Sequence, residues 1–187
     1  MNFNYLLTIL DLCGGTASWS APYLEAGYDV ITVDLDSTSQ DVRLFKKITG
    51  RKIHGILAAP PCCNFAASGA RWWEEKGEKA LLEGLSVVDA CMRIIAVHKP
   101  KFWALENPVG RLKDYLGKPV MYFNPCDYGD PYTKKTALWG EFNIPEKNKV
   151  EPTEGSKILK YGPSEDRKKL RSITPPGFAR AFYEANK

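Results

Sequence analysis

Two short segments of the chain carry side chains that could act as a nucleophile and as an acid. Cys62 follows two consecutive prolines, Pro60 and Pro61, which restrict the backbone that carries the thiol. A thiolate held in this way can act as a nucleophile. Glu106 precedes Asn107 after a short aromatic-rich run, and a partly buried carboxyl can keep its proton near neutral pH and act as an acid. The alternatives are a buried structural cysteine and a glutamate that caps a helix or lies on the surface.

A second group of residues is typical of a nucleoside cofactor site. Gly14 and Gly15 follow an apolar run, and glycine lets the backbone approach a bound group closely. Asp34 ends a second apolar run, at the position where ribose hydroxyls are usually bound. The glycine pattern matches neither the dinucleotide fingerprint nor a P-loop. The motif therefore disfavours dinucleotides and ATP and leaves another nucleoside cofactor.

The elements that must position these residues alternate along the chain. Apolar runs predict strands over residues 6–12, 28–33, 53–58 and 101–105, with a further strand pair over 120–123 and 136–138. Serine, glycine and proline signals predict helices from Ser18 or Ser20 to about Ala26 and from Pro175 to Ala185. Apolar residues near helical spacing predict a long helix from Glu74 to about Val97. Residues 143–164, rich in Pro, Lys, Glu and Gly, are expected to form a loop.

This alternation predicts a single α/β domain over residues 1–187, doubly wound and built on a mostly parallel sheet. Ligands bind such sheets beyond the carboxyl ends of the strands. The candidate residues all fall at predicted strand ends: Asp11, Asp34, Cys62 and Glu106.

Composition limits the compartment and the partners of the protein. The five cysteines are an odd number without zinc-like spacing, the two histidines have no ligand-like neighbours, and no long apolar run could span a membrane. These features predict a reduced, cytoplasmic, metal-free protein with no membrane partner. Acidic residues are in excess in the first half of the chain and basic residues in the second, as expected if the second half faces a nucleic acid.

In their order along the chain, these motifs resemble the cytosine-C5 DNA methyltransferase family from Leu10 to about Ala185. Residues 11–16 are similar to the family's Asp-Leu-Phe-x-Gly-x-Gly-like loop, which surrounds the methionine part of S-adenosylmethionine (AdoMet). The resemblance implies a Rossmann-like AdoMet-dependent methyltransferase domain. It assigns ribose to Asp34, the adenine ring to Leu35 and the adenine amino group to Asp41. The implied cofactor-binding residues are Asp11, Cys13, Gly14, Gly15, Asp34, Leu35, Asp41, Val42 and Pro60.

The resemblance also implies the catalytic residues. The family pattern Pro-Cys-x-x-Phe-Ser aligns with residues 61–66, which selects Cys62 over the adjacent Cys63 as the nucleophile that adds to C6 of cytosine. Glu106 matches the glutamate of the family's Glu-Asn-Val motif, which hydrogen-bonds to N3 of the base. Residues 128–136 resemble the family's Tyr-Gly-x-Pro-Gln-x-Arg-x-Arg. The implied substrate-binding residues are Asn64, Asn107, Lys134 and Thr136.

The chain departs from the family pattern at several positions. Leu35 replaces an aromatic residue, Ala66 a serine, and Lys134 and Thr136 the two arginines. Lysine lacks the planar fork of arginine, so bidentate contacts are not expected at Lys134. Residues 171–180 resemble the C-terminal family motifs, in which a helix completes the cofactor pocket, and the alternative is a plain terminal helix.

A separate target recognition domain is not expected, because only about thirty residues lie between Gly140 and Arg171. Flipping a base out of duplex DNA costs a few kcal/mol, and this chain has little surface to offset that cost. Such an enzyme either methylates DNA with short or loose specificity, depends on a separate recognition subunit, or acts on single-stranded nucleic acid or a free nucleotide. The absence of a recognition domain is typical of a small, phage-like enzyme.

The sequence thus predicts AdoMet-dependent methyl transfer to C5 of cytosine, in DNA, through a covalent cysteine adduct at C6. One alternative is another C5 modification of a pyrimidine on the same scaffold, in a nucleotide or RNA or with an altered AdoMet-like cofactor. A second alternative is a non-catalytic nucleic-acid-binding relative in which Cys62 and Glu106 are vestigial.

Overall fold

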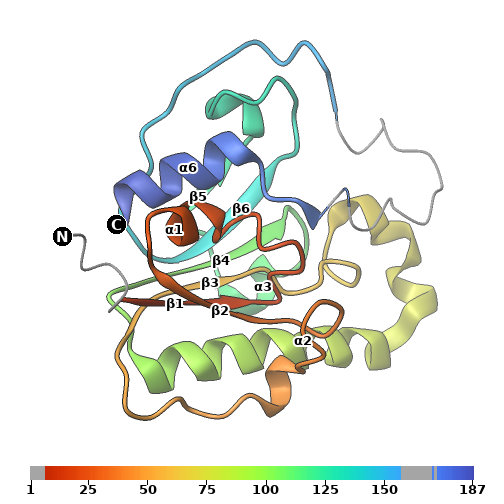
Figure 1. The fold of residues 1–187 in the computed structure, drawn as a ribbon. Helices are drawn as coiled ribbons and strands as arrows, with labels where there is room; N and C mark the ends of the chain where they lie inside the picture. The colour runs from red at the N-terminus through yellow and green to blue at the C-terminus, as the bar shows by residue number, and fades with distance from the viewer. Residues whose placement is uncertain (1–6, 157–169, 171) are drawn as a thin grey trace.

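A six-stranded sheet forms the centre of the protein in the computed structural model, which describes residues 7–156, 170 and 172–187 (Figure 1). The strand order is β2-β1-β3-β4-β6-β5. Strands β1 to β4 pair in parallel, whereas β6 runs antiparallel to both β4 and β5. The strands are β1 (Thr8–Leu12), β2 (Asp29–Val33), β3 (Ile53–Ala58), β4 (Phe102–Pro108), β5 (Met121–Phe123) and β6 (Thr136–Glu141).

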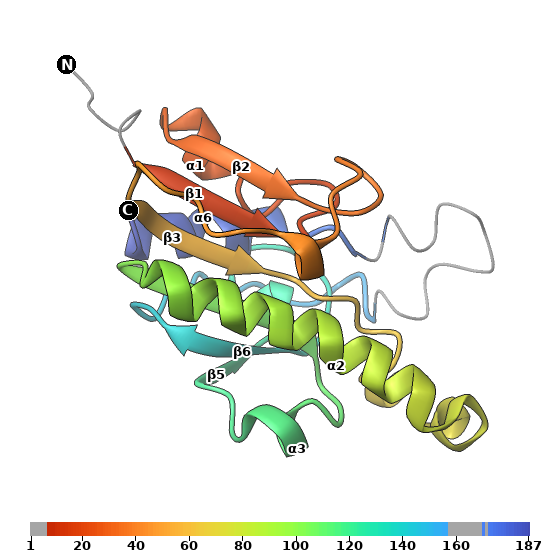
Figure 2. The same ribbon diagram turned by 90° about the horizontal axis from the view of Figure 1, so that it is seen from below.

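Helices cover both faces of this sheet (Figures 1 and 2). The long helix α2 crosses one face, and α1 and α6 lie on the other. Short 3₁₀ turns and a small helix lie in the connections. The helical elements are α1 (Ala21–Glu25), η2 (Val42–Leu44), η3 (Ala67–Trp72), α2 (Trp73–His98), α3 (Lys113–Leu116), η4 (Pro125–Asp127) and α6 (Pro176–Ala185).

Two hydrophobic cores lie between the sheet and the helices that cover it. The core under α2 is mainly aliphatic, with Val88, Cys91 and Ile94 of the helix packed with residues such as Leu10 and Ile56 of the strands. The core under α1 and α6 is rich in aromatic side chains, which include Trp19, Tyr23, Phe102, Phe178 and Phe182. Because both faces are covered, the central strands are mostly apolar, and all five residues of β1 are buried, including the polar Thr8 and Asp11. The predicted doubly wound, mostly parallel α/β fold is confirmed.

The strand boundaries differ from the prediction at one functionally important place. We predicted a strand over residues 101–105 with Glu106 after its end, but β4 continues to Pro108. The reason is tertiary: β6 pairs with β4 through Glu106 and Leu138, and the pairing ends at Pro108 and Thr136. Glu106 is therefore held within a strand rather than in a loop.

The helices also differ from the prediction in detail. Ser20 occupies the N-cap position of α1, but its side chain makes no capping bond, because the hydroxyl donates to Asp11. Gly27, with φ of 85°, follows the end of this helix as predicted. In α2, Gly77 has non-helical dihedrals (φ 66°, ψ −175°) and kinks a segment that we predicted to be continuous. Helix α6 begins at Pro176, one residue later than predicted.

The predicted loop lacks helix and strand over residues 143–156, and its remaining residues, 157–164, lie outside the described part of the chain. The same is true of residues 1–6 and of Arg171. Among the residues that the structure describes, no helix is both long enough and apolar enough to cross a membrane.

The aromatic core predicts a large cost for truncating Phe178. Its ring stacks on Phe123 with 3.9 Å between centroids and contacts Trp19 and Phe182. We expect Phe178→Ala to lower the free energy of unfolding by about 3–5 kcal/mol, measured by urea denaturation. The control is Leu44→Ala, because Leu44 is 79% exposed and should change stability by about 0.5 kcal/mol or less. Equal effects of the two substitutions would contradict this account of the core.

Candidate active site

The candidate residues gather at one edge of the sheet. Strands β1, β2 and β3 point the same way (Figure 2), and β4 is parallel to β3. The loops that follow β1, β2 and β3 therefore leave the sheet at the same edge, and Glu106 lies near the end of β4 at that edge. The parallel sheet thus brings together groups that are far apart in the sequence, as expected for this class of fold.

Asp11 is a buried carboxyl near the end of β1. It is 1% exposed, and its Oδ2 accepts a hydrogen bond of 2.5 Å from the hydroxyl of Ser20. Its other oxygen, Oδ1, is buried without a hydrogen-bond partner in the described part of the chain. Burial raises the pKa of Asp11 to about 6; the Ser20 hydrogen bond opposes this shift and the negative charge of Asp34 adds to it. Asp11 is therefore an acceptor that is only half used.

The loop after β1 lies directly against this carboxyl. A Cβ atom at Gly14 would come within 2.4 Å of Asp11, so only glycine allows this approach. Cys13 has φ of 57°, and its N–H donates to the carbonyl of Val33 on β2. The Cys13 side chain packs against the core under α2. Gly15, with φ of 48°, completes the left-handed turn.

The loop after β2 begins with an Asx turn. Oδ1 of Asp34 accepts hydrogen bonds from the N–H groups of Asp36 and Ser37, at 3.0 and 2.8 Å. The turn holds the Asp34 carboxylate at the sheet edge. Leu35 follows with its side chain 61% exposed, which leaves an apolar surface beside the carboxylate.

Asp41 and Val42 already make contacts within the protein, to Arg43 and to the hydrophobic core. The Asp41 carboxylate accepts from the backbone N–H of Arg43 and forms an ion pair with its guanidinium at 2.6 Å. The Arg43 hydrogen bond holds the pKa of Asp41 below its usual range. Val42 is buried in the core under α2. The carboxylate that the sequence assigns to the adenine amino group is thus already engaged by an arginine.

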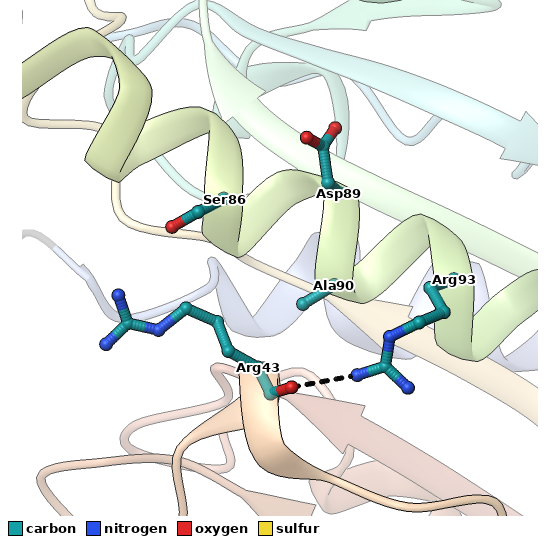
Figure 3. A pocket seen from close by; sticks show the side chains of 5 residues that line it. All are labelled: Arg43, Ser86, Asp89, Ala90 and Arg93. Carbon is teal, nitrogen blue, oxygen red and sulfur yellow. Dashed lines mark hydrogen bonds between the residues drawn. The ribbon is translucent and has the colours of Figure 1, made fainter.

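An open pocket of about 460 Å³ lies beside this segment, between η2 and α2 (Figure 3). Arg93 spans it and donates to the carbonyls of Arg43 and Phe45, both at 3.1 Å. Arg43 also forms an ion pair with Glu83 of α2. The pocket is lined by Arg43, Ser86, Asp89, Ala90 and Arg93. These contacts anchor η2, and with it Asp41, to the long helix.

The segment after β3 folds into a tight turn at Cys62. The carbonyl of Cys62 accepts from the N–H groups of both Phe65 and Ala66 at 2.9 Å. The carbonyl of Pro60 accepts from the side-chain amide of Asn107, also at 2.9 Å. Cys62 is partly exposed, whereas Cys63 is exposed. The turn therefore presents two adjacent thiols at the edge of the sheet.

This turn is fastened to the segment that follows β4. Ala67 donates to the carbonyl of Val109 at 2.9 Å, and Arg111 donates from its backbone N–H to Phe65 at 3.0 Å. Gly110 permits the contact, because a Cβ atom there would lie 1.8 Å from the carbonyl oxygen of Phe65. The Cys62 turn and the strand that carries Glu106 consequently form one hydrogen-bonded unit.

Glu106 is half-buried in β4 and lies near a lysine. Burial raises the pKa of Glu106, and the positive charge of Lys134 partly offsets the shift. Lys134 lies just before β6, which pairs with β4. Thr136 is 2% exposed, and its hydroxyl donates to the carbonyl of Lys134 at 2.9 Å. The side chain of Thr136 thus supports the turn that carries the lysine.

The two asparagines bind the protein backbone. Asn107 is fully buried and holds Pro60, as described above. Asn64 donates to the carbonyl of Ala80 in α2 at 2.6 Å.

The sequence motifs did not point to the residues that connect these segments, namely Ser20, Gly110 and Arg111. The sequence signal for Gly110 was a glycine close behind Glu106, whereas a contact such as that of Ser20 depends on the tertiary fold.

The C-terminal segment reaches the same edge of the sheet. The N–H of Thr174 donates to the hydroxyl of Ser18 at 2.8 Å, beside the glycine loop. The N–H of Gly177, in the first turn of α6, donates to Asp130 at 3.0 Å. The segment is therefore linked to both the loop after β1 and the loop that precedes Lys134, and it is more than a plain terminal helix.

Comparison with known proteins identifies the family of the chain. No family model matches it. A protein of Frog virus 3 (isolate Goorha) described as "Probable DNA (cytosine-5)-methyltransferase" is 34% identical over 149 residues, which cover 71% of this chain and 70% of the viral protein. The "Type II methyltransferase M.DdeI" of Desulfomicrobium norvegicum is 25% identical over 172 residues, which cover 71% of this chain and 40% of that enzyme.

A crystal structure shows the same fold. It is that of an E. coli protein described as a DNA modification methyltransferase encoded within a prophage, and it matches with a TM-score of 0.50 at 19% identity. The match covers 86% of this chain and 49% of that one, so the present chain spans about half the length of the crystallised protein. With 34% identity over most of both chains to the viral protein, and with the fold and the motifs described above, this chain belongs to the DNA (cytosine-5)-methyltransferase family.

Proposed function

We propose that the protein transfers a methyl group from AdoMet to C5 of a cytosine in DNA, with Cys62 as the nucleophile and Glu106 as the acid. The observation that carries the proposal is the hydrogen-bonded joint between the Cys62 turn and the segment after β4. It ties the turn that carries the partly exposed Cys62 to the strand that carries Glu106, whose pKa is raised by burial. Family membership supports the same reaction.

AdoMet fits the residues at the ends of β1 and β2. The approach of the loop to Asp11 depends on Gly14, and such a glycine turn can lie close to a bound group. The second oxygen of Asp11 is without a partner in the described structure, and AdoMet carries positive charge that a carboxylate attracts. Asp34 offers a carboxylate to ribose, and Leu35 offers an exposed apolar side chain to adenine. When bound, AdoMet supplies the methyl group.

The residues of the chain prepare the base to receive that group. The Cys62 thiolate forms a bond to C6, which moves electron density through the ring toward C5 and N3. The carboxyl of Glu106, whose pKa is raised by burial, donates in its protonated form to N3 and stabilises the charge that develops there. After C5 has gained the methyl group, loss of the C5 proton releases the thiolate and restores the aromatic ring. Lys134 lies close enough to Glu106 to affect its pKa and is a candidate contact for the base or its phosphate.

The remaining polar residues have supporting roles in this proposal. Asn64, Asn107 and Thr136 hold the backbone around the site through the bonds to Ala80, Pro60 and Lys134. The resemblance placed them on the substrate, but their side chains are buried or nearly so. We propose that they position the groups that touch the substrate.

The direct test is transfer of labelled methyl from AdoMet to duplex DNA, single-stranded DNA, RNA and dCTP. We expect label at C5 of cytosine in DNA. Label in RNA or dCTP alone would support the alternative function, C5 modification of a pyrimidine in RNA or in a free nucleotide. A product heavier than one methyl group would indicate a different donor, and the absence of label in all four substrates would favour a non-catalytic relative.

The two adjacent cysteines allow a matched comparison. We expect Cys62→Ala to lower the rate of transfer by more than about a thousandfold, because the covalent step is lost. Cys63→Ala should leave the rate within about twofold, since this thiol is the more exposed one and has no role in the proposed step. Both variants should bind AdoMet as the wild type does, measured by calorimetry. A larger loss of transfer rate in Cys63→Ala than in Cys62→Ala would show that Cys63 is the nucleophile.

The raised pKa of Glu106 predicts a pH dependence of the chemical step. As the pH rises through this pKa, the carboxyl loses the proton that it donates to N3, so the single-turnover rate should fall on the alkaline side. Glu106→Gln should lower the rate by about 10²–10⁴-fold and remove this alkaline decline. A variant that keeps the wild-type pH profile would show that another group supplies the proton.

Asp11 predicts a second pH dependence, this time in cofactor affinity. Burial raises the pKa of Asp11 to about 6, so its negative charge develops between about pH 5 and pH 7. A positively charged ligand prefers the ionised form, and we expect AdoMet affinity to rise about tenfold across this range. Calorimetry on Asp11→Asn should show no such rise. An equal rise in the variant would assign the effect to a different group.

A further inference from the structure

We infer that Arg111 is a positioning residue for the nucleophile and that it holds the Cys62 turn at its working distance from Glu106. The inference rests on the proposed function of these two residues and extends it to a side chain outside the motifs. Arg111 lies five residues after Glu106, beyond the end of β4. It is the residue of this segment that binds the Cys62 turn through both its backbone and its side chain.

The contacts of Arg111 span the turn. Its Nε donates to the carbonyl of Asn64 at 2.7 Å, and its backbone N–H donates to the carbonyl of Phe65 at 3.0 Å. Phe65 in turn donates to the carbonyl of Cys62. A single residue therefore fixes two consecutive carbonyls of the turn that begins at the nucleophile. A hydrogen bond from a charged donor is stronger than one between neutral groups.

The guanidinium is itself held in place. It stacks over the indole of Trp73, with 4.5 Å from its central carbon to the ring centroid, and such a stack restricts a long side chain. Trp73 is the first residue of α2. Arg111 thus joins three elements, namely the end of β4, the Cys62 turn and the start of the long helix.

The same guanidinium has an unusual electrostatic environment. Its Nη2 is buried and makes no hydrogen bond within the described structure, and the Trp73 Nε1 beside it is also buried and unpartnered. A desolvated donor without an acceptor costs free energy. This local cost occurs at a residue that makes two bonds to the Cys62 turn, and local costs of this kind are expected at functional sites.

A second cation near the turn is a less suitable candidate. Lys76 donates to the carbonyl of Cys63 at 2.8 Å and lies 3.4 Å from the amide oxygen of Asn64. Its side chain is exposed, and lysine has no rigid fork that would fix its direction. Lys76 can follow a displacement of the turn, whereas the stacked Arg111 resists it.

Catalysis between fixed groups is sensitive to such displacements, because an error of about 1 Å in position can cost about a hundredfold in rate. Loss of the Arg111 side chain removes the Nε bond and the stack, and it leaves the backbone bond to Phe65. The turn is then held at fewer points. Binding of the cofactor at β1 and β2 does not involve Arg111. The inference therefore predicts a fall in the chemical rate without a matching fall in cofactor affinity.

The test compares Arg111→Gln and Arg111→Lys with the wild type, using the full chain. At saturating AdoMet and DNA, we expect Arg111→Gln to lower kcat by about a hundredfold. Arg111→Lys should lie between this variant and the wild type, because it keeps the charge and a donor. AdoMet affinity should change by less than about twofold in both. A kcat for Arg111→Gln within twofold of the wild type would overturn the inference, as would equal losses of kcat and AdoMet affinity.

Arg71 provides a matched control, because it also stacks on an indole, that of Trp72 at 5.0 Å. It makes no hydrogen bond to the Cys62 turn in the described structure. Arg71→Gln should therefore leave kcat within about twofold. A fall in kcat as large as that of Arg111→Gln would show that loss of a surface arginine, and not loss of the bond to the turn, lowers the rate.

Two further measurements separate this inference from the proposed function. Capture on DNA synthesised with 5-fluorocytosine reports the covalent step, because fluorine at C5 cannot leave as a proton and the adduct persists. We expect slower capture with Arg111→Gln. Alkylation of Cys62 by iodoacetamide in a Cys63→Ala background needs no turnover, and the loosened turn should react several-fold faster.

An inactive wild type would refute the proposed function, but the alkylation rates would still decide whether Arg111 holds the turn. Equal alkylation rates with and without the Arg111 side chain would refute the inference even if methyl transfer were observed.

Discussion

The hydrogen-bonded joint between the Cys62 turn and the segment after β4 is the constraint on which the rest of the site depends. β3 and β4 are neighbours in the sheet, and the joint extends their association beyond the strands. Gly110 makes it sterically possible, and Asn107 adds a buried side-chain bond to Pro60. Because Glu106 is itself inside β4, Cys62 and Glu106 belong to one hydrogen-bonded unit. In the proposed function, such pre-organisation places the two reacting groups relative to each other.

The proposed cofactor side of the site has a different physical basis. Asp11 is a buried carboxyl with a single hydrogen bond, from Ser20, and its burial is unfavourable for the ionised form. The backbone of Gly14 lies directly against this carboxyl, which is 1% exposed. The sheet stabilises the arrangement because β1 is fully buried between β2 and β3. We regard the unused acceptor as a group that a positively charged ligand would satisfy, so stability and ligand affinity are linked at this residue.

The chain between β6 and α6 is extended over residues 143–156. Residues 143–156 run along the loop that precedes Lys134, with backbone bonds from Asn148 to Asp127 and from Val150 to Cys126, both at 2.9 Å. The N–H of Thr133 donates to Gly155 at 2.8 Å. This extended strap braces the loop that brings Lys134 to Glu106. Residues 143–156 support the loop that precedes Lys134 and add no helix or strand of their own.

The sequence by itself determined the class of fold and the identity of the motifs, because strand and helix periodicity, glycine turns and a Pro-Cys pair are local signals. The strands with their apolar runs and the order of Asp11, Asp34, Cys62 and Glu106 were all available without a structure. Only the tertiary structure decided how these side chains are engaged. Pairing with β6 carries β4 past Glu106, Ser20 donates to Asp11 instead of capping α1, and Arg43 occupies the Asp41 carboxylate. The pairing of β4 with β6 joins segments distant in sequence, and the Ser20 bond joins β1 to the start of α1. The Asp41–Arg43 ion pair is local, but Glu83 and Arg93 of the distant α2 anchor its arginine. No local propensity encodes which partner a polar group will find.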